Sequence, residues 1–274
     1  MIQLLKIEWL KLKRYKAFLI ISIFFTLGIF FYNYIVYSVF DNMINNSSAA
    51  VLLEKFNPYD FKYVWKSVSY TSGNLLILPA MLMIITITNE YTFKTNRQNI
   101  IDGWSRQQFL QIKISLAFLF ALFATVVVII CGFVFGWSTK SDLAFDGFSH
   151  IGYFFLKALS YNLFAVMLSV LIKKTGFGIG VFFIYLGAEN IISQILDSYS
   201  LYIKKIYKID LGSLGDYLPM SASDGLLTFP NSPLKAMTKD VLPTEYNGVV
   251  IFLAIIYLIL FYLVSNRKIL KSDK

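Results

Sequence analysis

Residues Asn89–Lys113 read NEYTFKTNRQNIIDGWSRQQFLQIK and separate two strongly apolar runs. Thr95 is followed three positions later by Gln98, and Ser105 stands in the same relation to Gln108. Both pairs fit the capping box, in which a hydroxyl and an amide side chain satisfy free backbone donors at a helix start. The pattern predicts two helix starts within one short connection.

The stretch between these two starts carries the signals of a stop and a sharp turn. Asp102 and Gly103 end the first helix, because glycine readily takes a positive φ. Trp104 and Phe109 occupy the N′ and N4 positions of a hydrophobic staple around the second box. We therefore expect a helix of about two turns over 96–101 and then an abrupt entry into the next apolar run.

This short helix brings apolar side chains next to basic ones. Ile100, Ile101 and Trp104 lie near water and are interleaved with Arg97 and Arg106. A helix of this length is marginal alone, so the exposed residues suggest a knob that enters a groove of a partner, with the arginines pairing to acids at its rim. The alternative is that they pack against the chain's own N-terminal helix or lipid headgroups.

The bulk composition is that of a membrane protein. The chain has 274 residues, of which 57% are hydrophobic and 15% charged, and these values exclude a soluble globular domain. The net charge of +9 does not indicate nucleic acid, because many cations flank apolar runs, where they set orientation. One cysteine, Cys131, excludes a disulfide framework and a cysteine-based metal cluster.

Six apolar runs are each near the length of about 20 residues that a helix needs to cross the hydrocarbon. Helices satisfy every backbone group in lipid, so we predict an all-α polytopic membrane protein with a single transmembrane domain over 1–274. The expected spans are 17–37, 68–88, 114–135, 152–172, 178–196 and 249–265.

Lysine and arginine gather in four segments that fall on one side of a six-span chain. These are the N-terminus, the connections after spans two and four, and the C-terminus, which predicts that both termini are cytoplasmic. The two sizeable outer segments are 38–67 and 197–247. Short helices and turns are expected in the second, because it contains Pro219, Pro230, Pro233 and Pro243.

The first 16 residues predict an amphipathic helix that lies flat in the membrane interface. Ile2, Leu5, Trp9 and Leu12 recur at helical spacing and form one apolar stripe, and most of the lysines lie away from it. The alternative is a simple extension of the first span.

Several polar residues are expected inside the membrane. A charged side chain there costs roughly 2.5–3.5 kcal/mol, so each should face protein or water rather than lipid. Pro79 predicts a kink in span two. For Glu189, a contact with cargo or the transport path and a structural hydrogen bond near the outer rim remain equal alternatives. The polar residues are Ser69, Thr71, Ser72 and Asn74 in span two, and Glu189 and Asn190 in span five.

The segment after span two resembles a known family. Glu90, Thr95, Ser105-Arg106 and Lys113 look like the pattern found there in permeases of ABC-2 type exporters. The six spans, basic N-terminal helix and long outer loop agree with it. The chain departs from the pattern at Lys94, where a glycine often precedes the threonine. Among members it looks closest to permeases of peptide-antibiotic resistance, lantibiotic immunity or sodium export.

The resemblance implies a permease subunit of an ATP-driven exporter in the bacterial cytoplasmic membrane. Residues 95–104 would form the cytoplasmic coupling helix that seats in one of two ATPase subunits, and a second permease chain, identical or related, would complete the path. The coupling residues would be Glu90, Thr95, Arg97, Ile100, Ile101, Trp104, Ser105 and Arg106. The path or dimer interface would use Ser69, Thr71, Ser72, Asn74, Glu189 and Asn190.

The chain has no G-x-x-x-x-G-K-[ST] phosphate loop. We therefore expect a non-catalytic subunit with no cofactor or metal of its own, and ATP and magnesium bound by the partner ATPase. The cargo would be an antimicrobial peptide, a lipid-like molecule or an ion. Two other functions remain open: a secondary transporter that uses Glu189, and a non-transporting immunity or scaffold protein that binds a peptide through 197–247.

Overall fold

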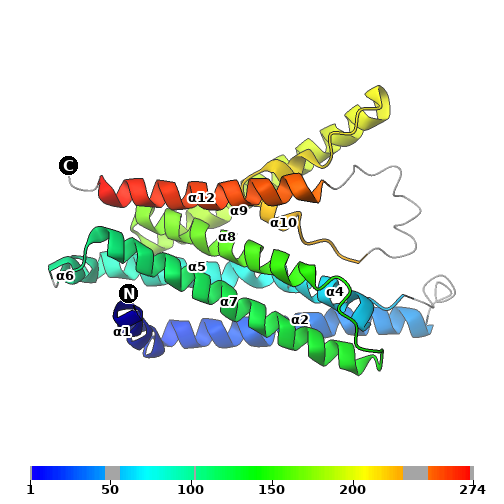
Figure 1. Ribbon diagram of the computed structural model, residues 1–274, viewed down its shortest axis with the longest axis horizontal. Coiled ribbons are helices and arrows are strands. Elements are labelled where there is room, and N and C mark those ends of the chain that lie inside the picture. Colours follow the sequence, from blue (N-terminus) through cyan, green and yellow to red (C-terminus); the bar gives the residue numbers. More distant parts are fainter. Residues whose placement is uncertain (1, 47–55, 102, 231–245, 272–274) are drawn as a thin grey trace.

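A computed structural model describes residues 2–46, 56–101, 103–230 and 246–271, and every element in these ranges is a helix (Figure 1). Six helical stretches are long and apolar enough to cross a membrane, as the sequence predicts. They are α2 (Lys16–Asn46), α4 (Phe61–Gly73) continued by α5 (Ile77–Thr92), α7 (Arg106–Ser138), α8 (Ser149–Ile172), α9 (Thr175–Tyr207) and α12 (Asn247–Leu270).

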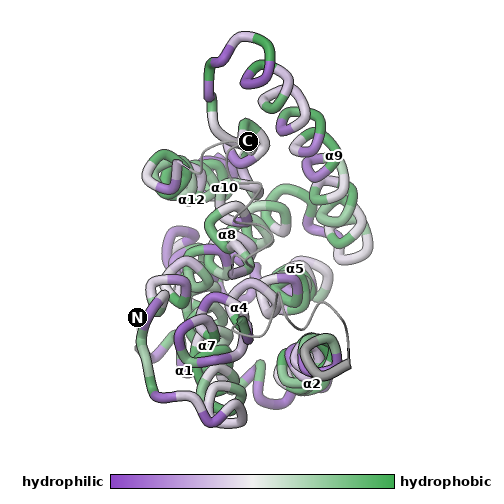
Figure 2. Tube along the Cα trace, turned by 90° about the vertical axis from the view of Figure 1, so that its right-hand side faces the viewer, coloured by the Kyte–Doolittle hydropathy of each residue, from purple (hydrophilic) through white to green (hydrophobic). Residues whose placement is uncertain are grey.

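Helix α8 lies at the centre of the bundle. It packs against α4, α5, α7, α9 and α12, and 67% of an 18-residue apolar stretch of this helix is buried. Helices α2, α9 and α12 lie toward the periphery when the bundle is viewed along its axis (Figure 2). Their apolar faces are mostly exposed, and only 11% of the corresponding apolar stretch of α9 is buried. These faces are suited to contact with lipid or another chain.

The second span is broken near its middle. Helix α4 passes through a short 3-10 turn, η1 (Asn74–Leu76), into α5. Pro79 follows directly, and a proline has no N–H for the carbonyl four residues earlier and clashes with it. That carbonyl belongs to Leu75, inside the turn. The kink expected at Pro79 is therefore taken up by the 3-10 turn.

Helices α4 and α7 cross closely at two glycines of α7. A Cβ on Gly132 would lie 2.9 Å from the Trp65 ring, and one on Gly136 would lie 2.6 Å from the Phe61 ring. Small residues four apart let helices in membranes approach each other. The pair explains how two large aromatic rings on α4 become fully buried.

The two chain ends and the coupling segment lie at the same end of the bundle, called here the termini end (Figure 1). Helix α1 (Ile2–Lys13) turns away from α2 and lies across this end, and α6 (Thr95–Ile101) lies beside it. The crosswise position of α1 differs from a simple extension of the first span, which was the alternative interpretation.

At the opposite end, called here the loop end, the chain folds back onto the bundle. Residues 197–207, expected in a loop, continue α9 as helix, and η2 (Leu214–Tyr217) and α10 (Ser221–Asp224) follow. Met220 and Leu227 are buried against the core. Pro233 and Pro243 lie outside the described residues.

Candidate functional site

The connection α5–α6–α7 has the second helix start that the sequence predicts. Ser105 Oγ accepts a hydrogen bond from Gln108 N at 3.1 Å, and Gln108 Oε1 accepts one from Ser105 N at 2.9 Å. Gly103 has a φ of +97°, and its N–H donates to the carbonyl of Ile100. The glycine stop is therefore confirmed, while Asp102 lies outside the described residues.

The first capping box is wrong. Thr95 is already the first residue of α6, and its hydroxyl donates to the Glu90 carbonyl at 3.4 Å instead of capping the helix. The carbonyl of Lys94 accepts the first helical bonds, from Arg97 N and Gln98 N. Lys94 thus stands at the N-cap, with a φ of 58°.

Lys94 adopts a left-handed conformation. This conformation costs a residue with a side chain roughly 1–2 kcal/mol, and glycine adopts it readily. A glycine would therefore fit this position of the chain with less strain than the lysine.

The apolar residues of the short helix do not all face outward. Ile101, the last residue of α6, is 84% exposed, and Phe93, two residues before α6 begins, is 73% exposed. Trp104 is half-buried, and Lys11 Nζ of α1 lies 5.7 Å from its ring centroid. For Trp104 the contact is thus with the chain's own N-terminal helix. Phe93 was missed, although an apolar residue in a polar connection is a readable signal.

A buried ion cluster holds this connection to the bundle. Lys113 on α7 is 1% exposed, and its Nζ lies 2.7 Å from Glu8 Oε2 of α1 and 2.7 Å from Glu90 Oε1 of α5. Lys11 Nζ lies 2.8 Å from Glu8 and 3.7 Å from Glu90. A buried charge is tolerated when it is paired and hydrogen-bonded, so the four groups stabilise one another across three helices.

Glu8 was missed by the sequence analysis. Burial opposes its ionisation, but Lys113 and Lys11 outweigh this effect and hold the pKa of the Glu8 carboxyl below its usual value. It is the only acidic residue before Asp41. A lone acid in a basic amphipathic helix is a usable signal of such a partner.

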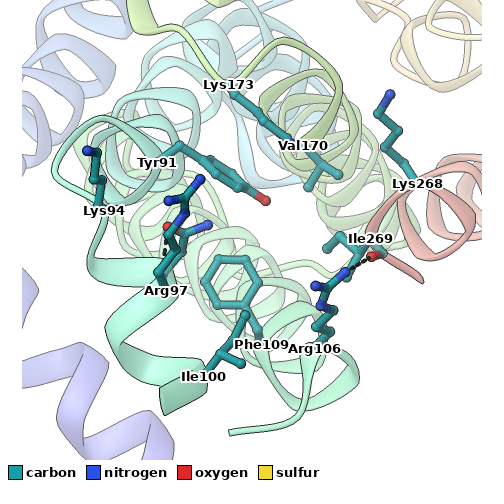
Figure 3. Close-up of a pocket in the computed structure, with 11 residues that line it drawn as sticks. Tyr91, Lys94, Arg97, Ile100, Arg106, Phe109, Val170, Lys173, Lys268 and Ile269 are labelled. Carbon is teal, nitrogen blue, oxygen red and sulfur yellow. Dashed lines mark hydrogen bonds between the residues drawn. The ribbon is translucent and has the colours of Figure 1, made fainter. Parts of the chain in front are cut away.

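Three other predicted coupling residues lie away from the exposed Ile101. Arg97, Ile100 and Arg106 line a pocket between α5, α6, α7, α8 and α12 (Figure 3). Arg106 Nη1 donates to the carbonyl of Ile269 on α12 at 3.5 Å. The eight predicted coupling residues therefore gather at one end of the bundle, but they divide between its surface, this pocket and the ion cluster.

The polar residues of span two face inward. Asn33 of α2 donates to Ser72 Oγ at 3.1 Å and accepts from Thr71 Oγ1 at 2.6 Å. Ser69 is buried as well. These side chains pack within the chain and do not reach its outer surface, while Asn74 is exposed at the 3-10 turn.

Glu189 lies at the base of the folded-back segment. Its Oε1 accepts backbone N–H groups of Met220 at 2.6 Å and Ser221 at 2.7 Å. This is the structural hydrogen bonding named as one of the two alternatives. Asn190 is exposed and accepts a hydrogen bond from Gln194. Glu189 and the polar residues of span two therefore have separate hydrogen-bond partners within the chain.

Among the described residues, no group of three or more His, Cys, Asp or Glu side chains is placed to hold a metal ion. A family model described as "Protein of unknown function (DUF2705)" matches residues 42–274. The comparison with curated proteins and the comparison with solved structures give no match.

Proposed function

We propose that this chain, which belongs to the DUF2705 family, is the membrane subunit of an ATP-driven exporter of the ABC-2 type. It would lie in the bacterial cytoplasmic membrane with both termini in the cytoplasm. The observation that carries the proposal is a short exposed helix, α6, whose two flanking helices are joined by a buried ion cluster.

The geometry of α6 favours docking into a partner. Phe93, just before α6, and Ile101, its last residue, have exposed apolar side chains. Exposed apolar anchors on a helix are the elements that insert into hydrophobic grooves of partner proteins. The partner we propose is an ATPase subunit with such a groove. It would bind the ATP and magnesium, because this chain has no phosphate loop of its own.

The ion cluster favours transmission of force from α6 into the membrane. Glu90 lies in the last turn of α5 and Lys113 lies about two turns into α7. Glu8 of α1 contacts Lys113, and Lys11 of α1 lies 3.7 Å from Glu90. A displacement of α6 would therefore move α1, α5 and α7 together as a rigid body. Two such chains would close and open a path between them, and the open apolar faces of α2, α9 and α12 leave room for a second copy.

The cargo we propose is an antimicrobial peptide, a lipid-like molecule or an ion, as in the resembled permeases. The two other functions have less support. Glu189 is occupied by two backbone N–H groups, which does not favour a proton or cation carrier. A passive immunity protein would have no use for an exposed, anchored α6.

The test is cross-linking from the exposed tip. A photo-reactive amino acid at Ile101, in the native host's membranes, should capture a protein that contains a phosphate-loop motif. The control is Leu143, an apolar residue that is 54% exposed and lies in the connection between α7 and α8. This connection is at the loop end. The I101D variant should lose co-purifying ATPase activity, and L143D should retain it. Capture of lipid and own-chain peptides alone would contradict the proposal.

A further inference from the structure

Five basic side chains from four parts of the chain line one pocket at the termini end. Its volume is about 400 Å³, and Figure 3 shows the labelled side chains arranged around it. The basic residues are Lys94, Arg97, Arg106, Lys173 and Lys268. None of the described residues that line the pocket is acidic.

This pocket differs from the ion cluster a short distance along the same helices. There Lys113 and Lys11 are matched by Glu8 and Glu90. In the pocket the basic residues line a common space, and none of the described lining residues carries a carboxylate. Like charges gathered in a partly enclosed site repel one another, and an anion in the centre relieves this repulsion.

The position of the pocket along the membrane spans indicates the source of the anion. Lys173 follows the last residue of α8, and Lys268 and Tyr91 lie in the last turns of α12 and α5. Basic residues at the ends of membrane spans lie at the level of lipid headgroups. Basic pockets between spans on the cytoplasmic side bind anionic headgroups.

The lining is suited to an amphiphile. Phe109, Val170 and Ile269 contribute apolar surface beside the cations. A free phosphate has no use for this surface, whereas the acyl chains of a phospholipid can pack against it. Lys173 Nζ lies 5.4 Å from the ring centroid of Tyr91, so the wall between them is already ordered by a cation–π contact.

We propose that this pocket binds the phosphodiester headgroup of an anionic phospholipid. The bound lipid would connect α6 to the ends of α8 and α12, beside the hydrogen bond from Arg106 of α7 to the Ile269 carbonyl of α12. The proposal depends on membrane insertion of the six spans and not on an ATPase partner, so the two proposals fail separately.

The experiment compares two double variants that each remove two charges from the same helix junctions. K173Q/K268Q changes residues that line the pocket, and K174Q/K271Q changes exposed neighbours that do not. Purified full-length protein in phosphatidylcholine nanodiscs is titrated with phosphatidylglycerol, and the thermal unfolding midpoint and the lipid retained in native mass spectrometry are measured.

Phosphatidylglycerol should raise the midpoint of the wild type and K174Q/K271Q alike. K173Q/K268Q should bind the lipid roughly tenfold more weakly or worse, with an unchanged midpoint in phosphatidylcholine alone. If that variant proves unstable, K173R/K268R preserves the charges and should retain the lipid effect. Equal losses in both glutamine pairs would overturn the proposal, because the effect would be diffuse.

Two further arms identify the source of the anion. Inorganic phosphate is added to lipid-free detergent samples, and stabilisation that depends on Lys173 and Lys268 there would overturn the lipid assignment. ATPase co-purification is measured for the same variants. Its loss with an unchanged response to phosphatidylglycerol would assign the pocket to an acidic protein segment and also overturn the proposal.

Discussion

Lys113 Nζ lies 2.7 Å from Glu90 Oε1, and this contact joins the last turn of α5 to a point about two turns into α7, across the seven residues of α6. The two residues are 23 positions apart in the chain. Each belongs to the pattern by which the chain resembles exporter permeases. The structure brings them together in one cluster, in which each charge helps to compensate the burial of the other.

Replacing Lys113 by methionine should destabilise the protein strongly. The change leaves Glu8 and Glu90 buried without their shared cation, and breaking a buried ion pair in this way costs about 3–5 kcal/mol. Thermal unfolding in detergent measures the loss. The triple variant E8Q/K113M/E90Q should recover much of it, because it removes all three charges. A K113M variant as stable as the wild type would contradict a paired cluster.

The attachment of α1 should depend on pH through Glu8. Lys113 and Lys11 hold the pKa of Glu8 below its usual value of 4.5 in the folded state despite its burial. Its contribution to stability is therefore complete above pH 4.5 and is lost as pH falls through the lowered value. The protection of the α1 amides from hydrogen exchange, corrected for the intrinsic pH dependence of exchange, should fall over that range. The E8Q variant should show lower protection at neutral pH and little further loss on acidification.

The K94G variant should be more stable than the wild type. Lys94 holds a φ of 58°, and glycine removes a strain of about 1 kcal/mol at such a position. The thermal midpoint should rise by a few degrees, while K94A should give no gain, because alanine retains the steric conflict. A fall in the midpoint of K94G would show that the lysine side chain stabilises the turn.

Glu189 should act as a structural acceptor. E189A leaves the N–H groups of Met220 and Ser221 without their acceptor, at a cost of about 1–3 kcal/mol for each buried group. E189Q keeps an acceptor oxygen and should lose less. N190A is the matched control, since that neighbour is exposed, and should be close to neutral. Transport abolished in a stable E189Q protein would instead favour the ion-coupled alternative.

Local sequence patterns are enough to predict the helices and their order. A run of about 20 apolar residues forms a helix in lipid whatever its neighbours are. The Ser105 capping box and the Gly103 stop depend on residues within four positions of each other, so they too are predictable. The prediction of the Thr95 box failed because Lys94, in a left-handed conformation, takes the N-cap position instead of Thr95.

Contacts between distant side chains depend on which face of each helix meets which neighbour, and near-uniform apolar runs do not encode this. The composition of span two shows that it has a polar face, but only the tertiary structure shows that Thr71 and Ser72 find a partner inside the chain, in Asn33 of α2. In the same way Glu8 meets Lys113 because α1 crosses the bundle end, 105 residues away in sequence. The basic pocket forms where the ends of five helices meet. The packing of the helices, rather than local sequence, brings these ends together.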